Sequence, residues 1–305
     1  MQVAVNLFYM LVGVAFLLLS RVRNLLRGYS PKPFTSSEWM RSANYDIAVV
    51  DGWLSHLAAY TGMPSVANKS ILELGPGSDL GTGLYLLSKH AAQYAAVDVY
   101  SMAPYAPSEL YEGLFDLIAA RGQIDLDYLR QELRMAQDGA GRRLKFILSP
   151  EFDLTSAIPG RSIDLVFSQA AFEHFDDFNS LLRQLEAVTK PGTIMIAEVD
   201  LRTHSRWIRD KDELNIYRYS DWTYNLLRYP GTPNRVRPYE YRDALERFGW
   251  TKIETKPLTV LSNERFSVVR QSLAERFRDE NNEMEQLSII LCATKSSLLL
   301  PEMKS

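Results

Sequence analysis

Residues 71–83 read Ile71-Leu72-Glu73-Leu74-Gly75-Pro76-Gly77-Ser78-Asp79-Leu80-Gly81-Thr82-Gly83, and this stretch decides how the rest of the chain is arranged. Its apolar start predicts a buried strand. Gly75 and Gly77 remove side chains where the backbone must turn sharply and a ligand must approach it closely. From Gly83 the apolar spacing becomes that of a helix, whose positive N-terminal end would face the turn. The stretch therefore predicts a ligand cradle.

A second predicted strand, Ala95 to Val99, carries Asp98 near its end. A carboxylate at the end of the second strand of a βαβ unit, about twenty residues beyond the glycines, can accept hydrogen bonds from ribose hydroxyls. The unit is therefore expected to bind a molecule that contains adenosine.

The composition of the glycine turn indicates which cofactor this is. A dinucleotide site needs a third glycine where this chain has Leu80, which weakens an interpretation as an NAD or FAD site. Glu73, just before the glycines, would repel a pyrophosphate but would suit the ammonium of S-adenosylmethionine. The sulfonium cofactor is the better fit.

The pattern Glu73-x-Gly75-x-Gly77, followed by Asp98, resembles the first two motifs of class I S-adenosylmethionine-dependent methyltransferases. Asp79 stands where that family often has a further glycine. The resemblance implies a Rossmann-like, seven-stranded, mostly parallel sheet with helices on both faces. The residues that it assigns to cofactor binding are Glu73, Gly75, Gly77, Asp79, Asp98, Asp153, Ser168 and Gln169.

Asp153, Ser168 and Gln169 follow two further predicted strands, 144–148 and 163–167. In the resembling family an acidic residue at the position of Asp153 hydrogen-bonds the adenine amino group, although an aspartate at a turn also serves purely local roles. Ser168 and Gln169 match the family's fourth motif, which lies beside the transferable methyl group.

A fifth predicted strand, 193–199, leads to Asp200 and His204. The carboxyl ends of parallel strands are where open α/β sheets place their chemistry. A neutral imidazole suits removal of a hydroxyl proton, so we predict His204 as the catalytic base, oriented by Asp200. The alternative is a structural or acceptor-binding histidine. For Glu173 and His174 we favour packing under the cofactor over catalysis.

The composition is that of a globular protein of 305 residues, with 46% hydrophobic and 23% charged residues. A formal net charge of −3 argues against a nucleic-acid partner. A single cysteine, Cys292, excludes an internal disulfide framework and a thiolate metal cluster. No metal site is predicted.

The N-terminal segment is unlike the rest of the chain. Residues 3–19 are apolar apart from Asn6, and Arg21, Arg23 and Arg27 follow. The run is near the lower limit of the ~17–25 residues that cross a bilayer. We predict that residues 1–29 form a single-pass membrane anchor with the catalytic domain in the cytoplasm, because the arginines should stay inside. An interfacial helix and a core helix are the alternatives.

The rest of the chain divides into a linker and helical lead-in, 30–69, and a methyltransferase domain, 70–305. Ser30 to Pro33 form the linker, and residues 35–37 offer a helix cap. The domain contains a predicted helical insert near 105–140 and an insert rich in aromatics and arginines near 202–241. The second insert is the predicted acceptor region. Its alternative is a partly buried insert whose arginines pair with its own acids.

These patterns predict an S-adenosylmethionine-dependent methyltransferase that O-methylates a glycan, lipid or isoprenoid-type acceptor at the cytosolic membrane face. A small-molecule or glycan/lipid acceptor and a membrane are thus the expected partners. Two alternatives remain: an NAD-dependent oxidoreductase, and a non-catalytic cofactor-binding membrane scaffold.

Overall fold

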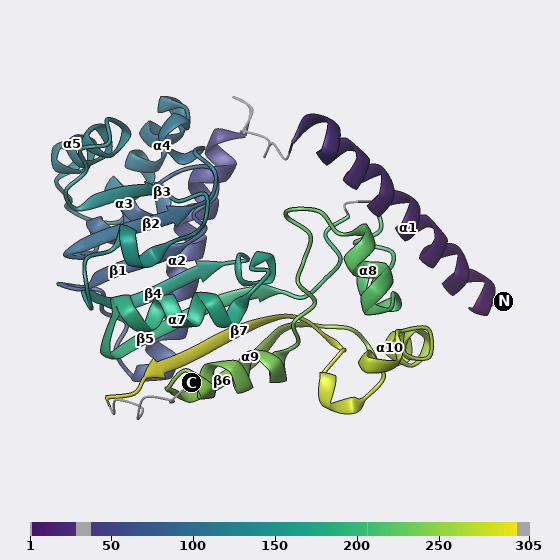
Figure 1. The fold of residues 1–305 in the computed structure, drawn as a ribbon. Coiled ribbons are helices and arrows are strands. Elements are labelled where there is room, and N and C mark those ends of the chain that lie inside the picture. Colours follow the sequence, from purple (N-terminus) through teal and green to yellow (C-terminus); the bar gives the residue numbers. More distant parts are fainter. Residues whose placement is uncertain (1, 29–37, 206, 298–305) are drawn as a thin grey trace.

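A computed structural model describes residues 2–28, 38–205 and 207–297, and a seven-stranded sheet forms its centre (Figure 1). The predicted linker at 30–33, the cap at 35–37 and Arg206 of the second insert lie outside the described residues. The strands are β1 Ser70–Leu74, β2 Gln93–Asp98, β3 Leu144–Leu148, β4 Ile163–Gln169, β5 Thr189–Asp200, β6 Trp250–Val260 and β7 Gln286–Lys295.

The strands lie in the order β3-β2-β1-β4-β5-β7-β6. β1 to β5 run parallel, whereas β7 is antiparallel to both β5 and β6. The predicted Rossmann-like, mostly parallel sheet is therefore confirmed. Its topology reverses next to β1, since β2 lies on one side of it and β4 on the other, and such a switch point is where open α/β sheets bind ligands.

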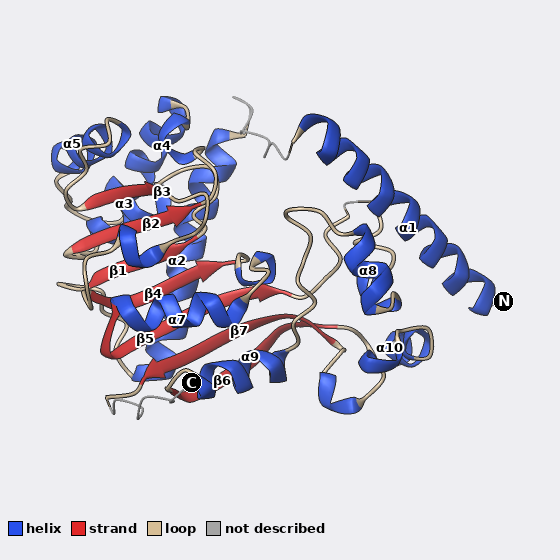
Figure 2. Cartoon of the chain, viewed as in Figure 1, coloured by secondary structure: helices blue, strands red, loops and turns tan. Residues whose placement is uncertain are grey.

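Helices cover both faces of the sheet (Figure 2). Side chains that alternate along the strands fill one core on each face. In β1, Ile71 packs into the first core, while Leu72 and Leu74 pack into the second. Strands that are buried on both faces read as apolar runs, which is why these segments were recognisable in the sequence.

The first face is covered by α2 Trp39–Thr61, α3 Gly81–Ser88, α4 Ser108–Ala119 and α5 Leu126–Gln137. A short helix, η1 Ala103–Tyr105, precedes α4. The close approach of α4 to α2 depends on Gly113, because a methyl group there would be 2.5 Å from the ring of Trp39. The second face is covered by α6 Leu154–Ala157, α7 Phe178–Val188 and α9 Pro238–Arg247.

Four further helices contribute to a third core beyond the carboxyl ends of β5 and β6: η3 Asn215–Arg218, α8 Asp221–Leu227, α10 Asn263–Arg270 and η4 Glu275–Phe277. The short η2 Phe172–His174 instead packs Phe172 into the second core, and η5 Glu280–Asn282 follows η4. The long α1, Gln2–Arg27, lies beside α8 (Figure 1). Leu17 of α1 is buried in the third core, so α1 packs against the domain along one side.

Some element boundaries differ from those that the sequence predicts. α3 begins at Gly81 rather than Gly83, because Asp79 accepts a hydrogen bond from the backbone N–H of Gly81 and so supports an earlier helix start. Between β6 and β7, α10 ends at Arg270, and the chain then turns before η4.

Candidate functional site

The glycine turn lies between β1 and α3 at the carboxyl edge of the sheet. Gly75 and Gly77 have φ values of 71° and 77°, in the left-handed region that favours glycine. A methyl group on Gly75 would be 2.8 Å from Cβ of Ala171, so this position must be bare for the turn to approach β4. A methyl group on Gly77 would meet nothing within 4 Å, so Gly77 faces open space. That space is available to a ligand.

Asp98 ends β2 and faces the same turn. Its carboxylate accepts hydrogen bonds from the backbone N–H of Gly77 at 3.3 Å and of Tyr100 at 2.9 Å. Burial raises its pKa despite these bonds. The carboxylate is therefore fixed beside the open space at Gly77, where the sequence predicts the ribose.

Glu73 lies at the end of β1 and is 2% exposed. One of its carboxylate oxygens accepts hydrogen bonds from the hydroxyls of Thr82, at 2.7 Å, and Tyr94, at 2.5 Å. Burial raises the pKa of Glu73 to about 7, against the effect of these two bonds. The side chain thus joins the turn to α3 and β2, and its predicted contribution to ammonium binding stays a prediction.

Asp79 faces Asp46, a residue of α2 that the sequence analysis did not select. Both carboxyls are buried, and burial is the main cause that raises both of their pKa values. Oδ2 of Asp46 is buried without a hydrogen-bond partner. A sequence signal existed, because Asp46 lies on the buried stripe of α2 with Ala43, Val50 and Trp53.

These four carboxylates, Glu73, Asp79, Asp98 and Asp46, gather around one turn. Within the described ranges, no lysine or arginine is among the groups that shift their pKa values. A buried, unpaired carboxylate oxygen calls for a cation or a hydrogen-bond donor. The residues therefore fit S-adenosylmethionine, a cofactor that carries both an ammonium and a sulfonium.

The raised pKa of Glu73 predicts a pH dependence of cofactor binding. A bound cation favours the ionised carboxylate, so the complex holds fewer protons than the free protein, and affinity must rise with pH. With one group of pKa about 7, we expect about tenfold tighter binding at pH 8 than at pH 6. Calorimetry in two buffers of different ionisation enthalpy measures the proton release. Glu73→Gln should flatten the profile, and equal affinity at both pH values would contradict this assignment.

Asp153, predicted to contact adenine, caps α6. It accepts hydrogen bonds from the backbone N–H groups and hydroxyls of Thr155 and Ser156. These bonds, led by that from the Ser156 hydroxyl, lower its pKa to about 2. The local role that the sequence offered as the alternative is therefore present, because both carboxylate oxygens already accept bonds from α6. An adenine contact stays a prediction.

Ser168 and Gln169 end β4, next to the turn. Ser168 is fully buried, and its hydroxyl donates to the carbonyl of Leu74 at 3.2 Å. The Ser168 side chain thus joins the ends of β4 and β1 and leaves only backbone for a ligand. Gln169 is half-buried at the edge.

His204 lies beyond the carboxyl end of β5. Burial, followed by the neighbouring His174, lowers the pKa of His204 to about 4, so the imidazole is neutral at pH 7. Its Nε2 is buried and makes no hydrogen bond. The nearest carboxylates are Glu173, whose Oε1 is 3.9 Å from Nε2, and Asp200, whose Oδ2 is 3.8 Å away. The atom that would take a proton is thus unpaired and buried close to both of these carboxyls.

The predicted orienting role of Asp200 needs correction. Its carboxylate accepts hydrogen bonds from the backbone and guanidinium of Arg202 and pairs with Arg209. At 3.8 Å from Nε2 it makes no hydrogen bond to His204. Asp200 pairs with Arg202 and Arg209 rather than with His204 because the arginines form several charge-assisted hydrogen bonds to the same two oxygens. Asp200 therefore acts on His204 only through its charge.

Glu173 and His174 lie against His204, and their predicted packing under the cofactor stays a prediction. The rings of His174 and His204 meet edge to face with centroids 4.9 Å apart. Both carboxylate oxygens of Glu173 are buried without a partner, and burial raises its pKa to about 8. Burial also lowers the pKa of His174. At neutral pH Glu173 thus keeps its proton, whereas the imidazoles of His174 and His204 are uncharged.

Neighbouring loops hold these groups in place. Asn234 donates to the carbonyls of Phe172 and Phe175, at 2.9 and 3.0 Å, and fixes the segment that carries Glu173. The hydroxyl of Tyr217 donates to the carbonyl of Leu201 at 2.7 Å, which holds the segment that leads to His204. Asn234 is a positioning residue that no motif in the sequence indicates.

A small pocket with a volume of about 30 Å³ opens beside His204. One wall belongs to the second insert, with Tyr229 and the segment 231–233. The other wall belongs to α1, with Gly13, Phe16, Leu17 and Ser20. The predicted acceptor region therefore contributes to a pocket, but α1 completes it.

Most of the insert's arginines are engaged within the protein, as the alternative interpretation proposed. Arg218 pairs with Asp212, both almost fully buried, and Arg235 pairs with Asp221. Arg237 is 0% exposed and donates to the carbonyls of Asn282, Glu283 and Gln286. These cations brace the third core, so they are not free to bind a charged acceptor.

Glu173, His174 and His204 also bring three potential ligand atoms within 4.8 Å of one another. The sequence predicts no metal, and methyl transfer from a sulfonium needs none. We therefore expect dialysis against EDTA to leave the turnover number unchanged. A loss of turnover that zinc restores would show that these three side chains bind a metal.

Comparison with known proteins gives one family. The sequence profile described as "Methyltransferase domain" matches residues 41–255. This range includes the glycine turn, Asp98 and His204. No curated protein matches the chain at a significant level.

Three solved structures with a similar fold are distant in sequence. The CurJ carbon methyltransferase is 17% identical, with 79% of this chain and 52% of that chain covered and a TM-score of 0.45. Phosphoethanolamine N-methyltransferase 2 of Haemonchus contortus is 12% identical, with 83% and 53% covered and a TM-score of 0.46. An S-adenosylmethionine-dependent methyltransferase of Mesorhizobium loti is 16% identical, with 81% and 100% covered and a TM-score of 0.42. The chain thus spans about half the length of the first two.

Proposed function

Because the chain belongs to the methyltransferase domain family and is an S-adenosylmethionine-dependent methyltransferase, we propose that it transfers a methyl group to a hydroxyl of a membrane-associated acceptor. The acceptor is a glycan, lipid or isoprenoid-type molecule at the cytosolic face. One observation carries the proposal: His204 lies at the carboxyl edge of β5 and also lines the pocket between α1 and the second insert.

The residues around the glycine turn hold the cofactor in this mechanism. Asp98 would bind the ribose hydroxyls, while the acidic side chains of Glu73, Asp79 and Asp46 would lie around the cationic end, where a bound cation favours their ionised forms. The cofactor supplies an electrophilic methyl group that an acceptor oxygen attacks in line. Gly77 leaves the space into which the ligand fits.

His204 accepts the proton that the acceptor hydroxyl loses as the new C–O bond forms. Burial keeps its imidazole neutral and ready, but a pKa of about 4 makes it a weak base in isolation. Asp200 favours the protonated imidazole through its charge. Glu173, with a pKa of about 8, is protonated at neutral pH, so the charge that favours the imidazolium comes from Asp200, whose pKa is lowered.

The apolar α1 supports attachment of this domain to a membrane. The most apolar 18-residue stretch of this helix has a mean hydropathy of 1.9, and only 11% of that stretch is buried in the protein. Arg21, Arg23 and Arg27 follow the apolar part and suit the anionic cytoplasmic surface. Membership of the methyltransferase family does not favour the oxidoreductase alternative.

Transfer of isotope-labelled methyl from S-adenosylmethionine into membrane extracts tests the proposal. We expect label in an acceptor that carries a new methyl ether. Calorimetry with S-adenosylmethionine and with NADH runs in parallel. Cofactor binding without transfer to any extract would instead favour the scaffold, and NADH binding without S-adenosylmethionine binding would overturn the cofactor assignment.

A further inference from the structure

One stripe of α1 packs along the third core over most of the helix. The stripe contains Asn6, Met10, Gly13 and Leu17, whose spacing of four, three and four residues puts them on one face. Leu17 is 7% exposed, and Met10 packs against the same core. The helix is thus docked on the domain from its N-terminal part onward rather than projecting from it.

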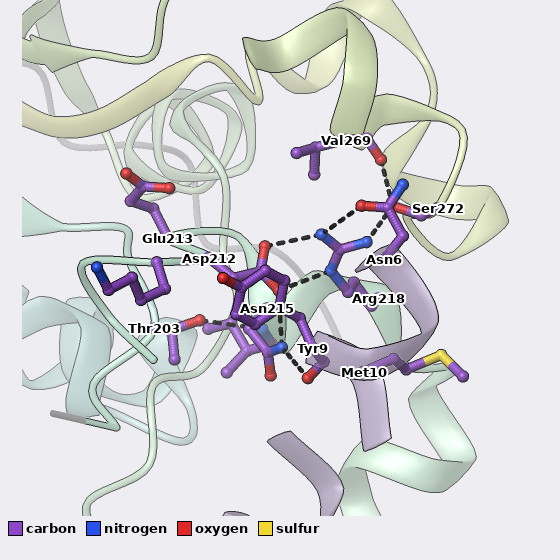
Figure 3. A network of polar contacts seen from close by, with 12 residues as sticks. Asn6, Tyr9, Met10, Thr203, Asp212, Glu213, Asn215, Arg218, Val269 and Ser272 are labelled. Atoms are coloured by element: carbon purple, nitrogen blue, oxygen red, sulfur yellow. Dashed lines mark hydrogen bonds and ion pairs between the residues drawn. The ribbon is translucent and has the colours of Figure 1, made fainter. Parts of the chain in front are cut away.

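Polar contacts fix this docking (Figure 3). Asn215 donates to the carbonyl of Tyr9 at 2.9 Å, and the hydroxyl of Tyr219 donates to the carbonyl of Met10 at 3.1 Å. A methyl group on Gly13 would overlap the side chains of Asn215 and Tyr219, so only glycine allows this approach. The contact is therefore specific and close.

The docked side also carries charge. Asn6 accepts a hydrogen bond from Arg218 at 3.4 Å, and Arg218 pairs with Asp212 at 2.8 Å (Figure 3). If α1 crossed a bilayer in this arrangement, its N-terminal half would draw Arg218, Asp212 and the surrounding insert into the hydrocarbon. Charged side chains are strongly disfavoured there. The docked helix is thus incompatible with the single-pass topology that the sequence predicts.

The face of α1 opposite the docked stripe is apolar and exposed, with Phe8, Leu19 and Leu26 at 55%, 66% and 79% exposure. Leu7, Leu18 and Leu25, which are 50%, 46% and 76% exposed, lie beside that face, within about 20° of one another and about 100° around the helix axis from the stripe. The three arginines at the C-terminal end add charge complementary to anionic lipid headgroups. Such a face fits a bilayer surface.

We propose that α1 lies in the plane of the membrane, with its outer face among the lipids, and that its inner face forms the wall through which a membrane amphiphile brings its hydroxyl to His204. The acceptor part of this inference rests on the proposed function and narrows it to a molecule with an apolar chain. Gly13, Phe16 and Leu17 line the pocket that contains His204, so the apolar wall and the base meet in one space. A soluble glycan would gain nothing from that wall.

Depth measurements test the position of α1 independently of catalysis. Leu7→Cys, Leu18→Cys and Leu25→Cys, each carrying a fluorescent probe in the full-length protein, are bound to vesicles of phosphatidylcholine and phosphatidylglycerol that contain depth-graded quenchers. Cys292 is buried and does not compete for the label. We expect one shallow depth for all three probes. In a spanning helix, Leu7 and Leu25 are about 27 Å apart along the axis, so a Leu18 probe much deeper than the other two would overturn the proposal. Leu148→Cys on β3, 48% exposed, is the control and should not be quenched.

The acceptor is tested by phase partition of labelled methyl after reaction with total membrane lipids and with water-soluble glycans. We expect the label in the organic phase. Gly13→Leu should lower this transfer at least tenfold with cofactor affinity unchanged, and the matched Ala15→Leu on the exposed side should leave it unchanged. Label confined to the aqueous phase would overturn the inference alone. No label in either phase, with cofactor bound, would overturn the proposed function as well.

Discussion

Replacing His204 with alanine should lower the turnover number by about 10²- to 10⁴-fold, the usual contribution of a positioned base. Cofactor affinity should stay nearly unchanged, because the side chain faces Glu173, His174 and the pocket, whereas the predicted cofactor residues cluster at the glycine turn. The two quantities are measured by labelled methyl transfer at saturating cofactor and by calorimetry.

The control for this variant is His56→Ala, because His56 is a half-buried histidine on α2 and does not line the pocket. It should keep the turnover number of the original protein. His174→Ala should reduce turnover as well, since its ring contacts that of His204. Wild-type turnover of His204→Ala across pH 6–9 would show that orientation alone carries the reaction, or that the base is another residue.

Gly77→Val should abolish cofactor binding, because the valine side chain would occupy the open space at the turn. Part of the effect of any such change is backbone strain, of about 1–2 kcal/mol in the left-handed region. Gly62→Val separates the two effects. Gly62 has a φ of 78° and likewise nothing within 4 Å of a Cβ, but it ends α2 away from the turn. This control should lose stability to a similar degree in thermal unfolding and keep cofactor affinity.

Asp98→Ala should weaken binding by about 10- to 150-fold, which corresponds to the ~1.5–3 kcal/mol of a charge-assisted hydrogen bond. Asp116→Ala, at an exposed position of α4, removes the same charge far from the turn and should change nothing. If a folded Gly77→Val or Asp98→Ala protein binds S-adenosylmethionine normally, the cofactor site lies elsewhere.

The sheet could be predicted because each strand is a continuous apolar run that ends in a recognisable turn or acid. The glycine turn, Asp98 and the position of His204 follow from local sequence for the same reason. Asp46 could have been found as a carboxylate on an apolar stripe. Side-chain partners could not be predicted in the same way. Nothing in the sequence near Asp200 shows that Arg209 would compete with His204 for the carboxylate oxygens of Asp200.

The packing of α1 against the domain could not be predicted from the sequence either. Hydropathy measures the whole helix and cannot tell which side meets lipid and which meets protein. Only the pairing of Gly13 with Asn215 and Tyr219, about 200 residues later in the chain, reveals the docked face. Similarly, the composition of the second insert suggested free arginines, whereas their partners lie in the same insert and in the segment before β7.

The place of β7 between β5 and β6 sets an order of events during synthesis. β6 has no partner until residues 286–295 leave the ribosome, because it pairs only with β7. At about 5–20 residues per second, the ribosome takes a few seconds to add the stretch from the end of β6 to the end of β7. During this interval β6 is an open edge, and such edges recruit other chains. We expect nascent chains stalled between these strands to aggregate or to bind chaperones, and chains that have released β7 to become protease-resistant in a single step.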